Sequence, residues 1–162
     1  METRQLSSEG ESLVKDWLER RGWSVSVAKS TPRLAGEARS EVLPDFRASH
    51  PEKGSQWIEV KTYNQYAVNR NIGAKVHGFA RDLWLSYRET AKQTGIPVWI
   101  FIYEPFSSQI LMSEIFEMDA VDCTCPSCQA GSPARCNQTP GGMVYFRRHR
   151  FKAVDVRQGA LF

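Results

Sequence analysis

The chain has 162 residues, of which 41% are hydrophobic and 24% charged, and its net charge is +3. This length fits one domain with a single core and excludes two ordinary domains, and the composition excludes a largely disordered chain. The polar start "METRQLSSEGE" lacks the apolar core of a signal peptide, and no apolar run is long enough to span a bilayer. We therefore expect a soluble, cytoplasmic protein whose cysteines are thiols or metal ligands.

The first predicted elements are a helix over residues 9–21 and a strand directly after it. Ser8 stands three residues before Glu11, as in a capping box, and apolar residues then recur at helical spacing. The segment "WSVSVA" alternates like a half-buried strand, and the composition of residues 29–40 is typical of a loop.

A hairpin, a second helix and a buried strand are predicted next. The segments "EVLPDFRA" and "QWIEVKTY" indicate two strands joined by a turn, and apolar residues repeat at helical spacing from about residue 72 to residue 94. Gly95 ends that helix, and the apolar run "IPVWIFIY" is typical of a strand covered on both faces. This order predicts an α/β fold with a mixed sheet flanked by helices.

Two carboxylates and a lysine stand on the predicted hairpin. Side chains of a strand alternate between faces, so Glu59 and Lys61 project from one face and their apolar neighbours from the other. Pairing across the hairpin brings Asp45 beside Glu59, where two carboxylates repel each other unless a cation lies between them. Mg²⁺ prefers such oxygen ligands, and a metal ion with a nearby ammonium group suits the hydrolysis of a phosphodiester.

Each of these residues also has a structural alternative. Glu59 and Lys61 would otherwise be a charge pair on a solvated sheet face, and Asp45 would belong to a turn at a strand end. Glu11 would otherwise only cap the helix, and Glu9 is a rival for its position. Three side chains after the lysine would either contact phosphate and bases or pack against the protein: Tyr63, Gln65 and Tyr66.

The order of these motifs resembles a known superfamily. Pro44-Asp45, followed by Glu59-Val60-Lys61 and preceded by a helix that bears Glu11, is similar to the PD-(D/E)xK nucleases. Within that superfamily the chain looks most like the archaeal-type Holliday-junction resolvases. Their Gly-aromatic pair after the first helix and their "GIPV"-like start of an apolar strand have counterparts here, and the resemblance covers roughly residues 8–105.

The resemblance implies a fold, a reaction and partners. The fold would be restriction-endonuclease-like, with a mixed β-sheet flanked by helices. The protein would be a Mg²⁺- or Mn²⁺-dependent endonuclease that cuts branched or otherwise structured DNA as a homodimer. Asp45 and Glu59 would be metal ligands, with the Val60 carbonyl beside them. Lys61 would be the catalytic lysine, and Glu11 would reach the metal directly or through water.

Four cysteines form a compact cluster in a Cys-rich insertion of about residues 122–137. They follow the pattern C-x-C-x2-C-x7-C: Cys123, Cys125, Cys128 and Cys136. Thiolates this close together, separated by small turn-forming residues, suit a tetrahedral structural zinc ion that supplies folding energy to the segment. The alternatives are free thiols and an iron-sulfur cluster, although the superfamily members with such a cluster have a cysteine ahead of the core, where this chain has none.

The last part of the chain is basic, since residues 133–162 carry six Lys or Arg residues against one acid. We predict a basic C-terminal strand of about residues 143–157, with a merely solvated face as the alternative. The cations expected to bind the nucleic-acid backbone are Arg147, Arg148, Arg150 and Lys152. Residues 1–162 would then form a single nuclease domain. The competing functions are a non-catalytic zinc-containing nucleic-acid-binding module and an RNA-processing nuclease of the same fold.

Overall fold

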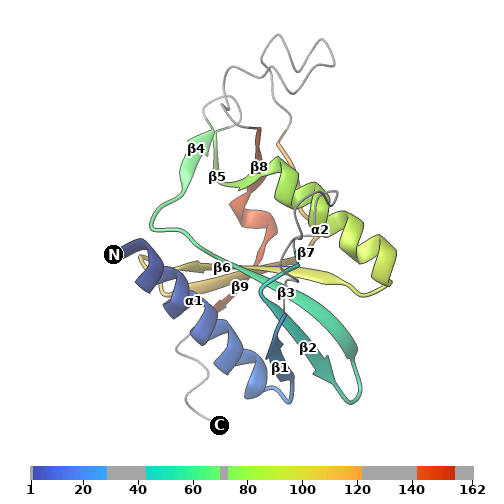
Figure 1. Cartoon of the computed structure of the whole chain (residues 1–162). Helices are drawn as coiled ribbons and strands as arrows, with labels where there is room; N and C mark the ends of the chain where they lie inside the picture. Colours follow the sequence, from blue (N-terminus) through green and yellow to red (C-terminus); the bar gives the residue numbers. More distant parts are fainter. Residues whose placement is uncertain (1, 29–42, 70–72, 122–141, 156–162) are drawn as a thin grey trace, which may run out of the picture.

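A computed structural model describes residues 2–28, 43–69, 73–121 and 142–155 (Figure 1). The helices in this part of the chain are α1 (Glu2–Glu19), α2 (Arg81–Thr94) and the single turn η2 (Arg148–Arg150). The strands are β1 (Ser24–Val27), β2 (Phe46–His50), β3 (Gly54–Thr62), β4 (Ala67–Asn69), β5 (Ala74–Ala80), β6 (Val98–Glu104), β7 (Gln109–Glu114), β8 (Met143–Arg147) and β9 (Lys152–Asp155).

The strands form two sheets. Sheet A has the order β1-β2-β3-β6-β7-β9, and sheet B has the order β4-β5-β8. Within sheet A only β3 and β6 are parallel, and their connection carries both the β4-β5 hairpin and α2. The chain therefore has a mixed α/β fold, as the sequence predicted.

Each face of sheet A has its own core, because alternate side chains of β3 and β6 point to opposite sides. The helix α1 covers one face (Figure 1), where the core includes Val14, Leu18, Ile58, Val60 and Phe101. The opposite face is covered by α2 and sheet B, and its core includes Trp57, Phe79, Tyr87, Ile100, Ile102 and Phe146. Strand β6 is buried on both sides, which explains its continuous apolar sequence.

The prediction of the second helix is wrong for the first part of its range. Residues 74–80 form strand β5, and the helix begins only at Arg81. The apolar positions in this segment are buried because β5 pairs with β8, a partner about seventy residues away that local spacing cannot indicate. The predicted end of the helix is confirmed, since Gly95 adopts a left-handed φ of 65° and its N–H donates to the Ala91 carbonyl.

Two other predictions about element limits are also wrong. Helix α1 begins at Glu2, so Ser8 lies inside the helix and does not cap it. The basic segment of residues 143–157 is not one strand, because η2 separates β8 in sheet B from β9 in sheet A. Within the described ranges no helix is long and apolar enough to cross a membrane.

Candidate active site

The hairpin of β2 and β3 brings Asp45 and Glu59 together. The antiparallel register places Phe46 opposite Ile58, so Asp45, the residue just before β2, stands beside the middle of β3. Its carboxylate oxygen Oδ2 accepts a hydrogen bond from the Val60 N–H at 2.8 Å. Its own N–H donates to Glu59 Oε2 at 3.2 Å. The Asp45 carboxylate is therefore held by the backbone of Val60, and the Glu59 carboxylate by the backbone of Asp45.

Lys61 completes this group on the same face of β3. Its ammonium nitrogen Nζ lies 2.8 Å from Glu59 Oε1. Glu59 is buried, with 3% of its surface exposed, whereas the Lys61 side chain is about one-third exposed at 32%. The aromatic ring of Phe79 lies behind the ammonium, with its centroid 5.5 Å from Nζ. The site thus places one buried acid and one accessible cation side by side.

Burial dominates the electrostatics of Glu59. The pKa of Glu59 is raised from 4.5 to about 7, mainly because burial removes the carboxylate from water. The charge of Asp45 also raises this pKa, whereas the charge and hydrogen bond of Lys61 and the hydrogen bond from Tyr87 lower it. A carboxylate with this environment is stabilised by any added positive charge. Carboxylate oxygens are the ligands that a hard cation prefers, so the chemistry of Asp45 and Glu59 fits such an ion. The Val60 carbonyl as a further ligand stays a prediction.

Tyr87 is a member of this site that the sequence did not identify. It lies on α2, where its spacing indicated only a buried helix face, and it is 2% exposed. Its side chain hydrogen-bonds to Glu59, and burial together with the Glu59 charge raises the pKa of the tyrosine hydroxyl. The hydroxyl is therefore a donor that holds the Glu59 carboxylate. No local signal could have predicted this, because α2 and β3 meet only in the folded protein.

Glu11 comes from a different part of the chain than Asp45, Glu59 and Lys61. It stands on α1, which packs on the opposite face of sheet A from Glu59 and Lys61. The neighbouring Gly10 fits closely against Thr62 and Tyr103 at the ends of β3 and β6. Within the described part of the chain, no three His, Cys, Asp or Glu side chains are grouped to hold a metal. The role of Glu11 as a third carboxylate therefore stays a prediction.

The four predicted nucleic-acid contacts have different surroundings. Arg147 forms an ion pair with Asp119 at 2.9 Å, and Arg150 approaches the same carboxylate at 3.5 Å while its side chain stays 64% exposed. Lys152 is exposed. Arg148 instead forms an ion pair with the buried Glu104. The four cysteines at 123, 125, 128 and 136 lie outside the described residues, so the zinc knuckle stays a prediction.

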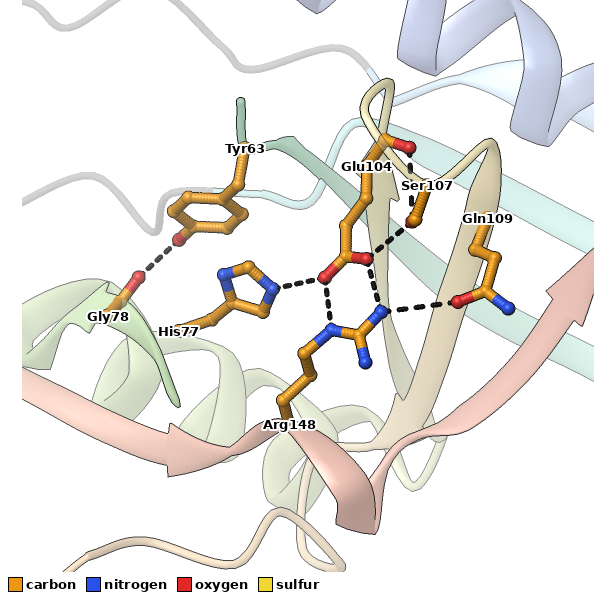
Figure 2. A network of polar contacts seen from close by, with 7 residues as sticks. All are labelled: Tyr63, His77, Gly78, Glu104, Ser107, Gln109 and Arg148. Carbon is orange, nitrogen blue, oxygen red and sulfur yellow. Dashed lines mark hydrogen bonds and ion pairs between the residues drawn. The ribbon is translucent and has the colours of Figure 1, made fainter. Parts of the chain in front are cut away.

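A second polar cluster joins the two sheets around Glu104, at the end of β6 (Figure 2). Arg148 binds its carboxylate in a bidentate manner, with Nε at 2.7 Å from Oε1 and Nη2 at 2.6 Å from Oε2. His77 Nε2 lies 2.6 Å from Oε1, and the Ser107 hydroxyl donates to Oε2 at 2.7 Å. Burial raises the pKa of Glu104, but the hydrogen bonds from Arg148, Ser107 and His77 outweigh it and lower the pKa to about 2.

Tyr63 links this second cluster to β3. Its ring stacks on His77 with centroids 4.7 Å apart, and its hydroxyl donates to the Gly78 carbonyl (Figure 2). The described contacts of Tyr63 thus favour the packing alternative over a direct contact with substrate.

The mixed sheet with a helix on each side is a resolvase-like fold, as the sequence predicted. The solved structure of Hjc, a Holliday junction resolvase from the archaeal hyperthermophile Archaeoglobus fulgidus, is similar to the chain with a TM-score of 0.54. The match covers 93% of this chain and 97% of Hjc at 12% sequence identity, so it shows the fold alone.

A second solved structure with a similar arrangement is D212, a nuclease from a fusselovirus. It matches with a TM-score of 0.47 and 10% identity, over 92% of this chain and 83% of that chain. No family model and no curated protein sequence matches the chain.

Proposed function

We propose that this protein is a divalent-metal-dependent endonuclease that hydrolyses DNA phosphodiesters, with branched or otherwise structured DNA as its substrate. The observation that carries the proposal is the pairing of Asp45 with Glu59 across the hairpin, with Lys61 Nζ 2.8 Å from the Glu59 carboxylate. The fold supports it, because a solved structure with a similar fold is a Holliday junction resolvase.

Each residue of the site has a defined task in this proposal. Asp45 and Glu59 would hold a Mg²⁺ or Mn²⁺ ion, and the Val60 carbonyl would be the further ligand. Such an ion, when bound, polarises a phosphoryl oxygen and lowers the pKa of a bound water. Lys61 is half-buried and carries a positive charge, so it orients the attacking water and stabilises negative charge on the phosphate in the transition state. Tyr87 keeps the Glu59 carboxylate in position.

Cleavage of a labelled four-way DNA junction in the presence of Mg²⁺ tests this proposal. The wild-type protein should cut the junction, and Asp45→Asn should abolish cutting while junction binding persists, since a neutral amide is a poor ligand for a hard cation. Asp16→Asn is the matched control, because Asp16 is an exposed residue of α1, and it should cut like the wild type.

The same experiment separates the competing functions. Failure to cut any DNA form with either Mg²⁺ or Mn²⁺ refutes the deoxyribonuclease. Binding that is salt-sensitive but indifferent to Asp45 and Glu59 would favour the non-catalytic binding module, and cutting of RNA alone would favour the RNA-processing nuclease. The homodimer and the structural zinc belong to the same proposal, and light scattering with zinc analysis of the purified protein tests both.

A further inference from the structure

An exposed aromatic side chain stands on the turn between β6 and β7. Phe106 is 46% exposed, although most large apolar side chains of the described residues are buried in the two cores. Its ring meets the ring of Tyr66 edge to face, with centroids 5.8 Å apart. Tyr66 comes from the segment between β3 and β4, so two distant parts of the chain build this aromatic pair.

Positive charge surrounds the aromatic pair. The Lys75 ammonium lies 4.6 Å from the centroid of the Tyr66 ring, and the Arg148 guanidinium carbon lies 5.8 Å from it. Lys75 is itself exposed. The cations occupy the Tyr66 ring, which leaves Phe106 as the ring with free surface. An exposed aromatic ring beside an exposed ammonium has the chemistry that binds a nucleobase and its phosphate.

The turn that carries Phe106 is anchored by the buried Glu104 cluster (Figure 2). Ser107, the next residue, donates its hydroxyl to the Glu104 carboxylate, which Arg148 binds in a bidentate manner. Gln109, at the start of β7, accepts a hydrogen bond from the same guanidinium at 3.2 Å. The turn is therefore fixed on both sides of Phe106. A preorganised ring loses little conformational entropy when a ligand stacks on it.

This aromatic pair lies on the same side of sheet A as the candidate active site. Lys75 belongs to sheet B, which covers the face of Glu59 and Lys61. Tyr66 follows Lys61 by five residues, so their Cα atoms are at most about 17 Å apart. That reach corresponds to about five nucleotide steps of one DNA strand. A nucleotide on Phe106 would therefore be only a few positions from the phosphodiester at the active site.

We infer that Phe106 stacks an unpaired nucleobase of the DNA substrate and that Lys75 binds the adjacent phosphate. This inference rests on the proposed function and specifies its substrate: DNA with unpaired or unstacked nucleotides close to the cleaved bond, as at a fork or branch point. Fully paired duplex presents no free base face, so it gains nothing from the ring.

Binding measured with EDTA, so that no strand is cut, tests the inference in the full chain. Fluorescence anisotropy gives the dissociation constants for a labelled single strand, a fork with unpaired arms and a fully paired duplex. Phe106→Ala should weaken binding of the fork and the single strand about 5- to 100-fold, with less than a twofold change for the duplex. Phe106→Trp, which keeps an aromatic ring, should bind the fork and the single strand like the wild type. Lys75→Gln should lower the magnitude of the slope of log binding constant against log salt concentration for the fork by about one.

The chain offers a matched control for the ring. Phe116 is exposed to the same extent, at 47%, and has an arginine guanidinium near its ring, that of Arg88 at 5.3 Å. Phe116→Ala should therefore bind all three DNAs like the wild type. Thermal unfolding of each variant confirms that the fold is retained. The inference is overturned if Phe106→Ala and Phe116→Ala weaken fork binding equally. It is also overturned if Phe106→Ala binds the fork like the wild type.

The outcomes also separate this inference from the proposed function. A wild-type protein that cuts DNA with Mg²⁺ but whose fork binding ignores Phe106 refutes only the inference. A protein that binds forks through Phe106 but cuts no DNA refutes only the nuclease. If the wild type binds none of the three DNAs, both proposals are wrong.

Discussion

Replacing Glu59 by glutamine tests the electrostatics of the candidate active site. The pKa of Glu59 is raised by burial from 4.5 to about 7 in the folded protein. Between these pH values the folded state holds a proton that the unfolded chain has released. The free energy of unfolding therefore falls as pH rises from 4.5 to 7, because the folded state binds more protons in this range.

The size of the effect follows from the change in pKa. At about 1.4 kcal/mol for each pH unit, the rise corresponds to about 3 kcal/mol of stability lost between pH 4.5 and 7. Glutamine does not titrate, so the stability difference between wild type and Glu59→Gln should change by this amount and become constant above pH 7. Burial lowers the pKa of His77, so below pH 6.5 this residue makes the free energy of unfolding rise with pH. His77 is present in both proteins, so its contribution cancels in the difference between them.

Urea unfolding monitored by tryptophan fluorescence, in EDTA at several pH values from 4.5 to 8, gives the required free energies. Mg²⁺ should then stabilise the wild type at pH 8, by about 1.4 kcal/mol at ten times its dissociation constant, and should leave Glu59→Gln unchanged. Parallel pH profiles for the two proteins would refute the reasoning. Equal stabilisation of both by Mg²⁺ would refute the metal ligand role of Glu59.

Two further substitutions probe the surroundings of the site. Tyr87→Phe removes a hydrogen bond that lowers the pKa of Glu59, so the midpoint of the same pH transition should move above pH 7 in the unfolding experiment, and an unmoved midpoint would contradict that role. Arg148→Met leaves the fully buried Glu104 carboxylate without its main partner and should cost about 3 kcal/mol in urea unfolding. The control Arg150→Met removes an exposed side chain and should change stability by less than about 0.5 kcal/mol, so a similar loss in both variants would argue against the buried pair.

Local sequence determined the hairpin and the charged side chains that it brings together. The alternation of polar and apolar residues in β3 places Glu59 and Lys61 on one face, and this is confirmed by the 2.8 Å distance between their charged groups. The short turn before β3 sets the register, which brings Asp45 to Glu59. These features are predictable because residues close in sequence build them. The end of α2 at Gly95 is local in the same sense.

Tertiary structure alone decided the assignments that depend on distant partners. Residues 74–80 have apolar positions compatible with a helix, and only pairing with β8 makes them a strand. Arg148 was predicted to bind nucleic acid, but its guanidinium is held by Glu104, forty-four residues earlier in the chain. Tyr87 reaches Glu59 only because α2 packs on that face of sheet A. A side chain's role depends on its partners, and when these partners lie far apart in the sequence, only the packing of helices on sheets brings them together.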